Sequence, residues 1–251
     1  MRFANFIPFL AGISSPLLWW WLLKTPNNYW IVFLVIIFLN LLAMFVIDRE
    51  AGKKWWNFAL LPMLAQLVVM GYAIIISSPL LIIILMTCLV VFIYIYWRYV
   101  YFYFHRPKRY PSFSLEQLSF YISYLLIFFL GALAFGLRSF LNFNLGILVG
   151  GVAIITALVL YQIMWVSKVD WRKFVWYWLA YLIIMMETFW ALSFLPLNHN
   201  LLGFLWASVY YFFSVILNDL LNHQFTSKRV RNYLIMITIG WIVLLLSARW
   251  L

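Results

Sequence analysis

Charged residues are scarce in this sequence. Only 9% of its 251 residues are charged, and just six are acidic. A soluble domain has about 25% charged residues, so a water-soluble fold of this composition could not cover its surface with polar groups. The longest polar connection, 105–117, has about a dozen residues, too few for even a small soluble domain. Six acidic residues also leave an acid–base enzyme few groups to work with.

Cysteine is nearly absent as well. Cys88 is the only thiol, so an intramolecular disulfide is excluded, and within an apolar run it is expected to be a small buried hydrophobe. The motifs His-Glu-x-x-His, Gly-x-Ser-x-Gly and Cys-x-x-Cys and the P-loop are missing, as are paired acids that could hold Mg²⁺ on a diphosphate substrate. We therefore assign no catalytic residue, no cofactor and no metal site.

Hydrophobic residues make up 68% of the chain, and aromatic residues 22%. A membrane-spanning helix needs about 20 mainly apolar residues, and nine runs separated by turn-forming residues meet this requirement. We predict an all-α, polytopic transmembrane helical bundle in a single integral membrane domain. Merging runs across the tight breaks at 25–28 and 77–79 would leave eight or seven spans. The predicted spans are 6–24, 29–47, 56–76, 80–104, 117–137, 145–166, 174–195, 201–221 and 233–250.

The first of these runs superficially resembles a signal peptide. Small residues should mark the cleavage site of such a peptide, whereas Trp19, Trp20 and Trp21 follow here. We expect the run to be a retained span.

Basic residues predict the orientation of the chain, whose net charge is +11. With nine spans, 14 of the 17 Lys and Arg residues fall on one side, and only Lys24, Arg138 and Arg249 fall on the other. Because basic residues collect in cytoplasmic loops, we predict a cytoplasmic N-terminus and an external C-terminus. The basic loops are expected to contact anionic lipid headgroups. Nucleic acid is not an expected partner, because there is no soluble fold to carry a basic face.

Glu187 is the clearest candidate functional residue, because ionisable groups within a membrane are costly and usually functional. Arg249 and Arg138 are expected at a similar depth in the outer half of the membrane. Three roles stay open for the carboxylate: an ion pair with Arg249 that fixes run 174–195 against run 233–250, a proton-relay or substrate-binding group, or a group exposed near the headgroups. Helical spacing predicts that Glu187 shares its face with Ala180, Ile183, Ile184, Trp190, Ala191 and Phe194.

A second candidate is a polar cluster near the inner interface. Asp219, Asn222 and His223 are three and four residues apart and share one helical face. Two such groups could ligate a metal, but a site needs a third or fourth ligand. We favour interfacial polar residues with satisfied partners, with Arg98 or Lys228 pairing with Asp219.

Some polar and small residues within the spans predict helix packing. The uncharged Asn40, Gln66 and Gln162 are expected to form interhelical hydrogen bonds. The spacings Gly146-xxx-Gly150 and Ala132-xxx-Gly136 predict close approach of helix backbones.

The last part of the chain carries a family resemblance in residues 187–251. It reads Glu-Thr-Phe-Trp-Ala-Leu-Ser-Phe-Leu-Pro over 187–196, followed by a Tyr pair at 210–211, a basic Lys-Arg at 228–229 and a terminal Ala-Arg-Trp at 248–250. This pattern resembles an uncharacterised family of bacterial multi-pass membrane proteins. The resemblance implies a small all-helical protein of the bacterial cytoplasmic (inner) membrane and adds weight to Glu187, Trp190 and Arg249. It implies no activity.

Three classes of function remain open from the sequence. The first is a membrane carrier or lipid-handling protein, with a polar site around Glu187, Arg249, Trp190 and Arg138 in the outer half of the membrane. The second is a non-catalytic membrane assembly subunit or scaffold with membrane protein partners. The third is a membrane-embedded enzyme acting on a lipid-linked substrate. We favour the first, and membrane lipids are then the expected partners.

Overall fold

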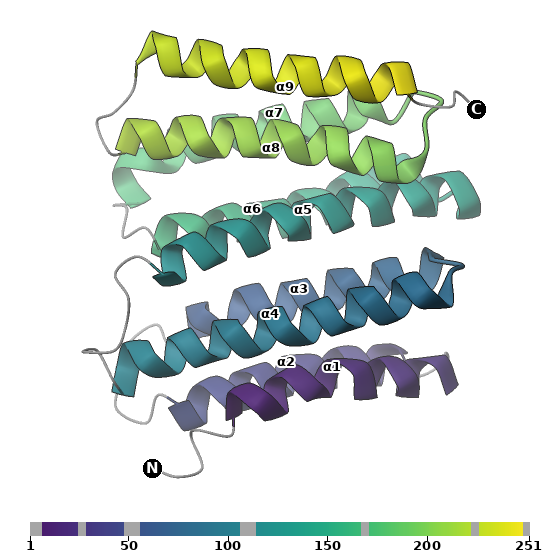
Figure 1. Cartoon of the computed structure of the whole chain (residues 1–251), viewed down its shortest axis with the longest axis vertical. Coiled ribbons are helices and arrows are strands. Elements are labelled where there is room, and N and C mark those ends of the chain that lie inside the picture. The colour runs from purple at the N-terminus through teal and green to yellow at the C-terminus, as the bar shows by residue number, and fades with distance from the viewer. Residues whose placement is uncertain are drawn as a thin grey trace. The chain divides into compact units, whose positions relative to one another are not determined.

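The computed structural model describes residues 7–24, 29–47, 56–105, 114–166, 171–221 and 226–247 (Figure 1). Over these ranges the chain forms nine α-helices and no strand, which confirms the predicted all-α polytopic bundle. The helices are α1 (Ile7–Lys24), α2 (Tyr29–Ile47), α3 (Trp56–Ile75), α4 (Pro79–His105), α5 (Ser114–Leu141), α6 (Leu145–Val166), α7 (Trp171–Leu192), α8 (His199–Leu221) and α9 (Ser227–Ser247).

Eight of these helices, α2 to α9, are long and apolar enough to cross a membrane. The chain is therefore an integral, multi-pass membrane protein. Helix α1 falls outside this set of eight, although it occupies the first predicted run, so its membrane crossing stays a prediction. Its composition explains the difference, because two serines, two prolines, three tryptophans and Lys24 lie among its apolar residues.

The helix ends differ from the predicted spans where polar residues continue a helix. The last run was predicted to begin at 233, whereas α9 begins at Ser227 and includes Lys228, Arg229 and Arg231. Lysine and arginine are good helix formers, and a helix keeps its backbone hydrogen bonds outside the hydrocarbon. The apolar run therefore marks the membrane-embedded part of α9, and the helix itself is longer.

The chain divides into two compact units, Met1–Leu126 with Trp165–Ser167, and Ile127–Met164 with Lys168–Leu251. We call them unit 1 and unit 2. Helix α5 contributes its first half to unit 1 and its second half to unit 2. The prediction of a single integral membrane domain stays a prediction.

In unit 1, α1 packs along α4, and α3 contacts both α2 and α4. The backbones of α1 and α4 approach closely at Gly12, where a Cβ atom would lie 3.1 Å from the carbonyl oxygen of Val90. Three buried polar side chains link α1, α2 and α3: the Asn40 amide donates to Gln66 Oε1 at 2.6 Å, and the Gln66 amide donates to Ser15 Oγ at 2.8 Å. The predicted interhelical hydrogen bonding of Asn40 and Gln66 is confirmed.

Pro62 inside α3 creates a second polar link in unit 1. Proline has no backbone N–H, so the carbonyl of Phe58, four residues earlier, loses its helical donor. The Tyr96 hydroxyl of α4 donates to this carbonyl oxygen at 2.9 Å. A neighbouring helix thus satisfies the freed acceptor, as a membrane interior requires.

In unit 2, α8 packs against both α7 and α9. Helices α5 and α8 cross with their backbones almost in contact, since a Cβ atom at Gly203 would lie 2.6 Å from the backbone nitrogen of Ala132. Ala132 thus lies at a close crossing, as predicted. The prediction for Gly146 and Gly150 is wrong within the described chain, because a Cβ atom at Gly150 would meet nothing within 4 Å. That side of α6 is open.

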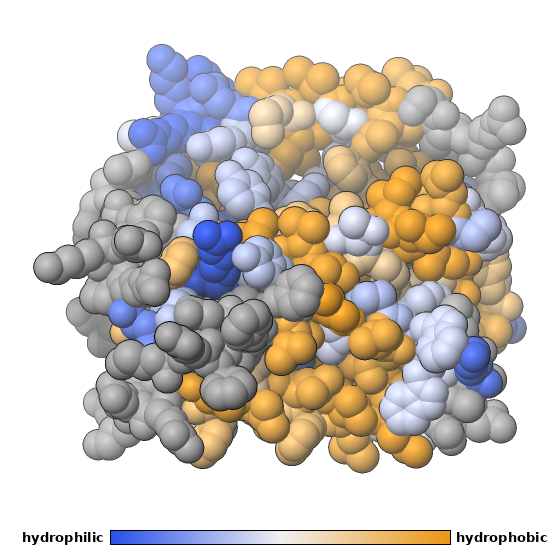
Figure 2. Space-filling view, turned by 60° about the horizontal axis from the view of Figure 1, so that its bottom comes forward, coloured by the Kyte–Doolittle hydropathy of each residue, from blue (hydrophilic) through white to orange (hydrophobic). Residues whose placement is uncertain are grey.

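The surface is largely apolar. In Figure 2 apolar residues cover most of the visible described surface, and hydrophilic residues gather toward the left of the picture. Exposed Leu, Ile and Phe side chains lie on helices in both units, among them Phe38, Ile83, Ile154 and Ile239. Cys88 is also exposed, which contradicts the expected buried hydrophobe. These surfaces suit hydrocarbon, so a thiol on them remains in an apolar environment.

Candidate functional site

Glu187 lies on α7, five residues before the helix ends at Leu192. Of the residues predicted to share its face, Ala180, Ile183, Ile184, Trp190 and Ala191 lie on α7, whereas Phe194 follows the end of the helix. Ile183, Trp190 and Phe194 are each more than half exposed. Glu187 is exposed as well, and no hydrogen bond or ion pair joins its carboxylate to another described residue. The carboxylate therefore lies on an outward-facing, apolar side of the helix.

The opposite side of α7 is firmly held within unit 2. The Trp206 indole of α8 donates to the Met185 carbonyl oxygen at 2.9 Å. Both residues are completely buried where the two helices meet. Phe189 is buried between α5 and α8, with its ring 4.5 Å from that of Phe135 and 5.5 Å from that of Trp206. These contacts fix the rotation of α7, and that rotation sets Glu187 outward.

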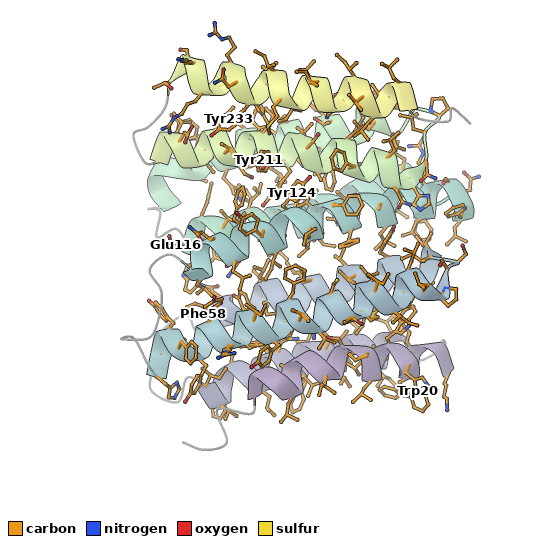
Figure 3. The ribbon with its side chains drawn as sticks, viewed as in Figure 1. Trp20, Phe58, Glu116, Tyr124, Tyr211 and Tyr233 are labelled. Atoms are coloured by element: carbon orange, nitrogen blue, oxygen red, sulfur yellow. The ribbon has the colours of Figure 1, made fainter. Side chains whose placement is uncertain are left out.

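Tyr181 adds a third attachment between α7 and α8. Its buried hydroxyl donates to the Tyr210 carbonyl oxygen and lies 2.7 Å from Ser214 Oγ. Tyr211, labelled in Figure 3, belongs to the same stretch of α8. The sequence reasoning gave Tyr181 no role, and a tyrosine within an apolar run carries no signal of its partner.

Arg138, near the end of α5, lies close to Phe194, which follows the C-terminal end of α7. Its guanidinium carbon lies 5.4 Å from the centroid of the Phe194 ring, and the Phe194 ring lies 5.0 Å from that of Trp190. The Arg138 Nη1 atom is buried and has no hydrogen-bond partner among the described residues. We refer to Glu187, Trp190, Phe194 and Arg138 as the Glu187 patch.

The patch combines one acidic and one basic group around two aromatic rings. Cation–π attraction holds the guanidinium over the Phe194 ring, and Trp190 suits a membrane–water interface because its ring is apolar and its N–H is polar. The patch can therefore contact an ammonium group through Glu187, an anion through Arg138 and apolar chains through its rings.

The predicted ion pair between Glu187 and Arg249 has no support within the described residues. Arg249 lies outside them, and Glu187 is exposed and so is not buried against α9. Of the three roles left open for the carboxylate, exposure on the surface of the bundle agrees with its position. The sequence correctly grouped the residues of one helical face but did not reveal that this face is the outward one.

The predicted inner-interface cluster is only partly described. Asp219 is buried, and its Oδ1 lies 3.5 Å from Nη1 of Arg229 on α9. Asn222 and His223 lie outside the described residues. Arg98 is exposed, with its guanidinium near the rings of Tyr94 and Phe102 on its own helix.

The partner of Asp219 is thus Arg229, where the sequence had suggested Arg98 or Lys228. Arg229 was missed because the hydropathy pattern placed it in a loop, while it belongs to the first turn of α9. Among the described residues, no three His, Cys, Asp or Glu side chains gather as a metal site would require.

Gln162 behaves differently from the other two polar residues of the spans. It is completely buried on α6, and neither its amide nitrogen nor its amide oxygen has a hydrogen-bond partner among the described residues. The predicted interhelical hydrogen bond is therefore absent at Gln162, in contrast to Asn40 and Gln66.

Comparison with known proteins adds no relative. No protein-family model, curated protein or solved structure matches the chain.

Proposed function

We propose that this multi-pass membrane protein is a lipid-handling protein that binds a zwitterionic phospholipid headgroup at the Glu187 patch. The observation that carries the proposal is the Glu187 carboxylate, exposed on an apolar helix face without a partner among the described residues. A carboxylate in such surroundings is costly unless a cation neutralises it. The ammonium group of a lipid headgroup is a cation that a lipid-facing side chain can meet where it lies near the headgroup region.

The depth of Glu187 supports contact with a headgroup. Five residues separate it from the end of α7, which at 1.5 Å per residue is about 7 Å along the helix. On each side of the bilayer, the headgroup and interfacial region adds about 5–7 Å to the hydrocarbon core. Glu187 can therefore reach the boundary between headgroups and acyl chains.

Arg138 supports the choice of a headgroup that also carries a phosphate. Its side chain is half-buried and so partly accessible, and arginine is well suited to phosphate oxygens. The aromatic rings of Trp190 and Phe194, 5.0 Å apart, provide apolar contact area beside Arg138. An aminophospholipid supplies all three kinds of group.

The location of the protein is a further part of this proposal. We propose a bacterial cytoplasmic membrane, with the N-terminus inside and the Glu187 patch in the outer half. The distribution of basic residues and the family resemblance of residues 187–251 support this placement.

A second candidate function is a membrane assembly subunit, and α9 favours it. None of the membrane-crossing window of α9, Ser227–Leu246, is buried. Its exposed residues include Met236, Ile239, Val243 and Leu246. This exposed length of α9 offers a face on which the helix of a partner protein can pack.

Lipid titration of the purified protein tests the first proposal. Delipidated protein is titrated with phosphatidylethanolamine or phosphatidylglycerol, and bound lipid is counted by native mass spectrometry. Glu187→Gln should weaken phosphatidylethanolamine binding by about tenfold, the effect of losing one hydrogen bond to a charged group. Phosphatidylglycerol binding should not change, because that headgroup has no ammonium.

Thr188→Val is the matched control, because Thr188 lies next to Glu187 on α7 and its hydroxyl is already bound to the Ile184 carbonyl oxygen of its own helix. Equal phosphatidylethanolamine binding by wild type and Glu187→Gln would refute the proposed headgroup contact. A protein bound in place of lipid, in material released directly from its membrane, would support the assembly subunit.

A further inference from the structure

The first half of α5 carries a row of three polar residues that the Glu187 patch does not use. Glu116, Ser119 and Ser123 are spaced three and four residues apart, so they lie on one face of the helix. Figure 3 shows Glu116 at the left-hand end of α5. Ser119 and Ser123 lie about 4 Å and about 10 Å further along the helix axis. We call these three residues the α5 polar row.

The two serines are buried and unsatisfied. Ser119 is 1% exposed and Ser123 is 0% exposed, and neither hydroxyl has a hydrogen-bond partner among the described residues. Buried polar groups are nearly always hydrogen-bonded, and in a membrane an unsatisfied one is especially costly. These hydroxyls therefore call for a polar partner that is not a side chain of the described chain.

Three threonine hydroxyls of this chain find a partner in their own helix, whereas the buried Thr156 hydroxyl, like those of Ser119 and Ser123, has none among the described residues. Thr87, Thr188 and Thr238 each donate to the carbonyl oxygen four residues earlier, at 2.7–2.8 Å. This is the usual solution for serine and threonine in a helix. Ser119 and Ser123 do not adopt it, so their hydroxyls stay available to a partner outside the helix.

A third unsatisfied polar atom lies at the same depth of unit 1. Trp97 is completely buried on α4, and its indole N–H has no hydrogen-bond partner among the described residues. It lies eight residues before the end of α4 at His105, about 12 Å along the axis, and Ser123 lies nine residues after the start of α5, about 13 Å along it. Since α4 leads directly to α5, both depths are measured from the same end of unit 1.

We propose that the α5 polar row is a hydrated site that admits water and a small cation into unit 1, with Glu116 at its entrance. Water satisfies unpaired buried hydroxyls where the site has room for it and offers two or more polar partners. The carboxylate of Glu116 attracts cations and disfavours anions at the entrance. The hydroxyl oxygens of Ser119 and Ser123 supply the oxygen ligands that small hard cations prefer. This site is independent of the Glu187 patch.

Silver-ion accessibility of single cysteines tests the proposal in the full-length protein. Cys88 is the only native thiol, so Cys88→Ala gives a thiol-free background. Ser119→Cys and Ser123→Cys are added singly, Ag⁺ (as its nitrate) is applied, and remaining free thiol is measured with a maleimide after denaturation. Ag⁺ is a small cation that reacts with thiols it can reach through water.

The matched control is Ile122→Cys. Ile122 is 5% exposed and lies at the depth of Ser123, but one position away and therefore about 100° round the helix. Both serine-derived cysteines should lose their free thiol at least about tenfold faster than this control, and Glu116→Gln should slow them by about tenfold because it removes the attracting charge.

Three outcomes decide the matter. Faster reaction at both positions, slowed by Glu116→Gln, supports the site. Reaction at either position no faster than at Ile122→Cys overturns the hydrated row. Fast reaction that Glu116→Gln leaves unchanged overturns the cation entrance. Thermal transitions of the variants are compared first, and if one serine variant fails to fold, the other one is measured against Ile122→Cys and carries the test.

Discussion

One buried glutamine in each unit differs in its hydrogen bonding. Gln66 uses both ends of its side chain, accepting from Asn40 and donating to Ser15, and so connects three helices. Gln162 is equally buried, yet its amide is unpaired among the described residues. The two residues are chemically identical and both lie within apolar helices, so any difference in their contributions to stability comes from their hydrogen bonds.

Replacing each glutamine by leucine measures this difference. Gln66→Leu breaks two interhelical hydrogen bonds and leaves Ser15 Oγ and one Asn40 contact unsatisfied, so we expect a loss of about 1 kcal/mol in the free energy of unfolding. Gln162→Leu removes an unpaired buried amide and should be neutral or stabilising. Unfolding in mixed micelles, followed by circular dichroism, gives both values. A loss at Gln162 as large as that at Gln66 would mean that the Gln162 amide has a partner after all.

At the scale of helices, the closest contact of unit 2 is the crossing of α5 and α8. Gly131 and Gly203 face each other there, and a Cβ atom at Gly131 would lie 3.0 Å from the Gly203 Cα atom. At Gly203 the nearest obstructing atoms are the backbone nitrogen and Cα atom of Ala132, which cannot move aside as the end of a side chain would. Glycine is thus required by the close approach of two helices.

Gly203→Ala should therefore destabilise unit 2. Its methyl group would lie 2.6 Å from a backbone nitrogen of α5, and overpacking of this kind costs about 1–3 kcal/mol. The matched control is Gly150→Ala, whose methyl group meets nothing within 4 Å. That change should stabilise α6 by up to about 1 kcal/mol, because alanine is the better helix former. Thermal unfolding in detergent compares the two, and equal effects would contradict the crossing.

These helix contacts also define what the sequence could predict. Apolar runs and breakers located all the described helices, because length and hydropathy are local properties. The Gly146 and Gly150 pair had the expected local spacing, yet the close crossing uses Gly131 and Gly203, whose pairing depends on tertiary structure. Likewise, spacing grouped Glu187 with Trp190, but both sides of a membrane helix are apolar, so hydropathy could not tell the outward face from the buried one.

At the scale of the whole molecule, polarity is distributed as lipid requires. Large apolar side chains such as Trp176 and Leu246 are more than three-quarters exposed, while polar residues such as Asn40, Gln66 and Thr156 are buried. A soluble monomer rarely exposes large contiguous apolar patches. In hydrocarbon the hydrophobic effect no longer drives helices together, so close packing and interhelical hydrogen bonds hold each unit together.

Whether the two ends of the chain lie on the same side of the membrane depends on how many helices cross it. The number is eight without α1 and nine with it. Eight crossings by α2 to α9 place the two ends of that segment on one side, and a ninth by α1 places the N-terminus opposite the C-terminus. The hydropathy of α1 is lowered by its serines, prolines and Lys24. However, α1 is held along α4 and its Ser15 is completely buried in the hydrogen-bonded cluster with Gln66. A helix packed in this way against a membrane-crossing helix is itself expected to cross.

Tags at both ends of the chain test this expectation. A fluorescent protein that matures only in the cytoplasm should be bright when fused before Met1 and dark when fused after Leu251, and an alkaline phosphatase, active only outside, should give the reverse. The basic breaks, such as 48–55 and 167–173, should report the cytoplasm, because moving their Lys and Arg residues across the membrane is unfavourable. Two dark ends would mean that α1 does not cross, although the other eight helices would keep their predicted orientation. A dark N-terminal fusion combined with a bright C-terminal one would reverse the whole bundle and place the Glu187 patch in the inner half of the membrane.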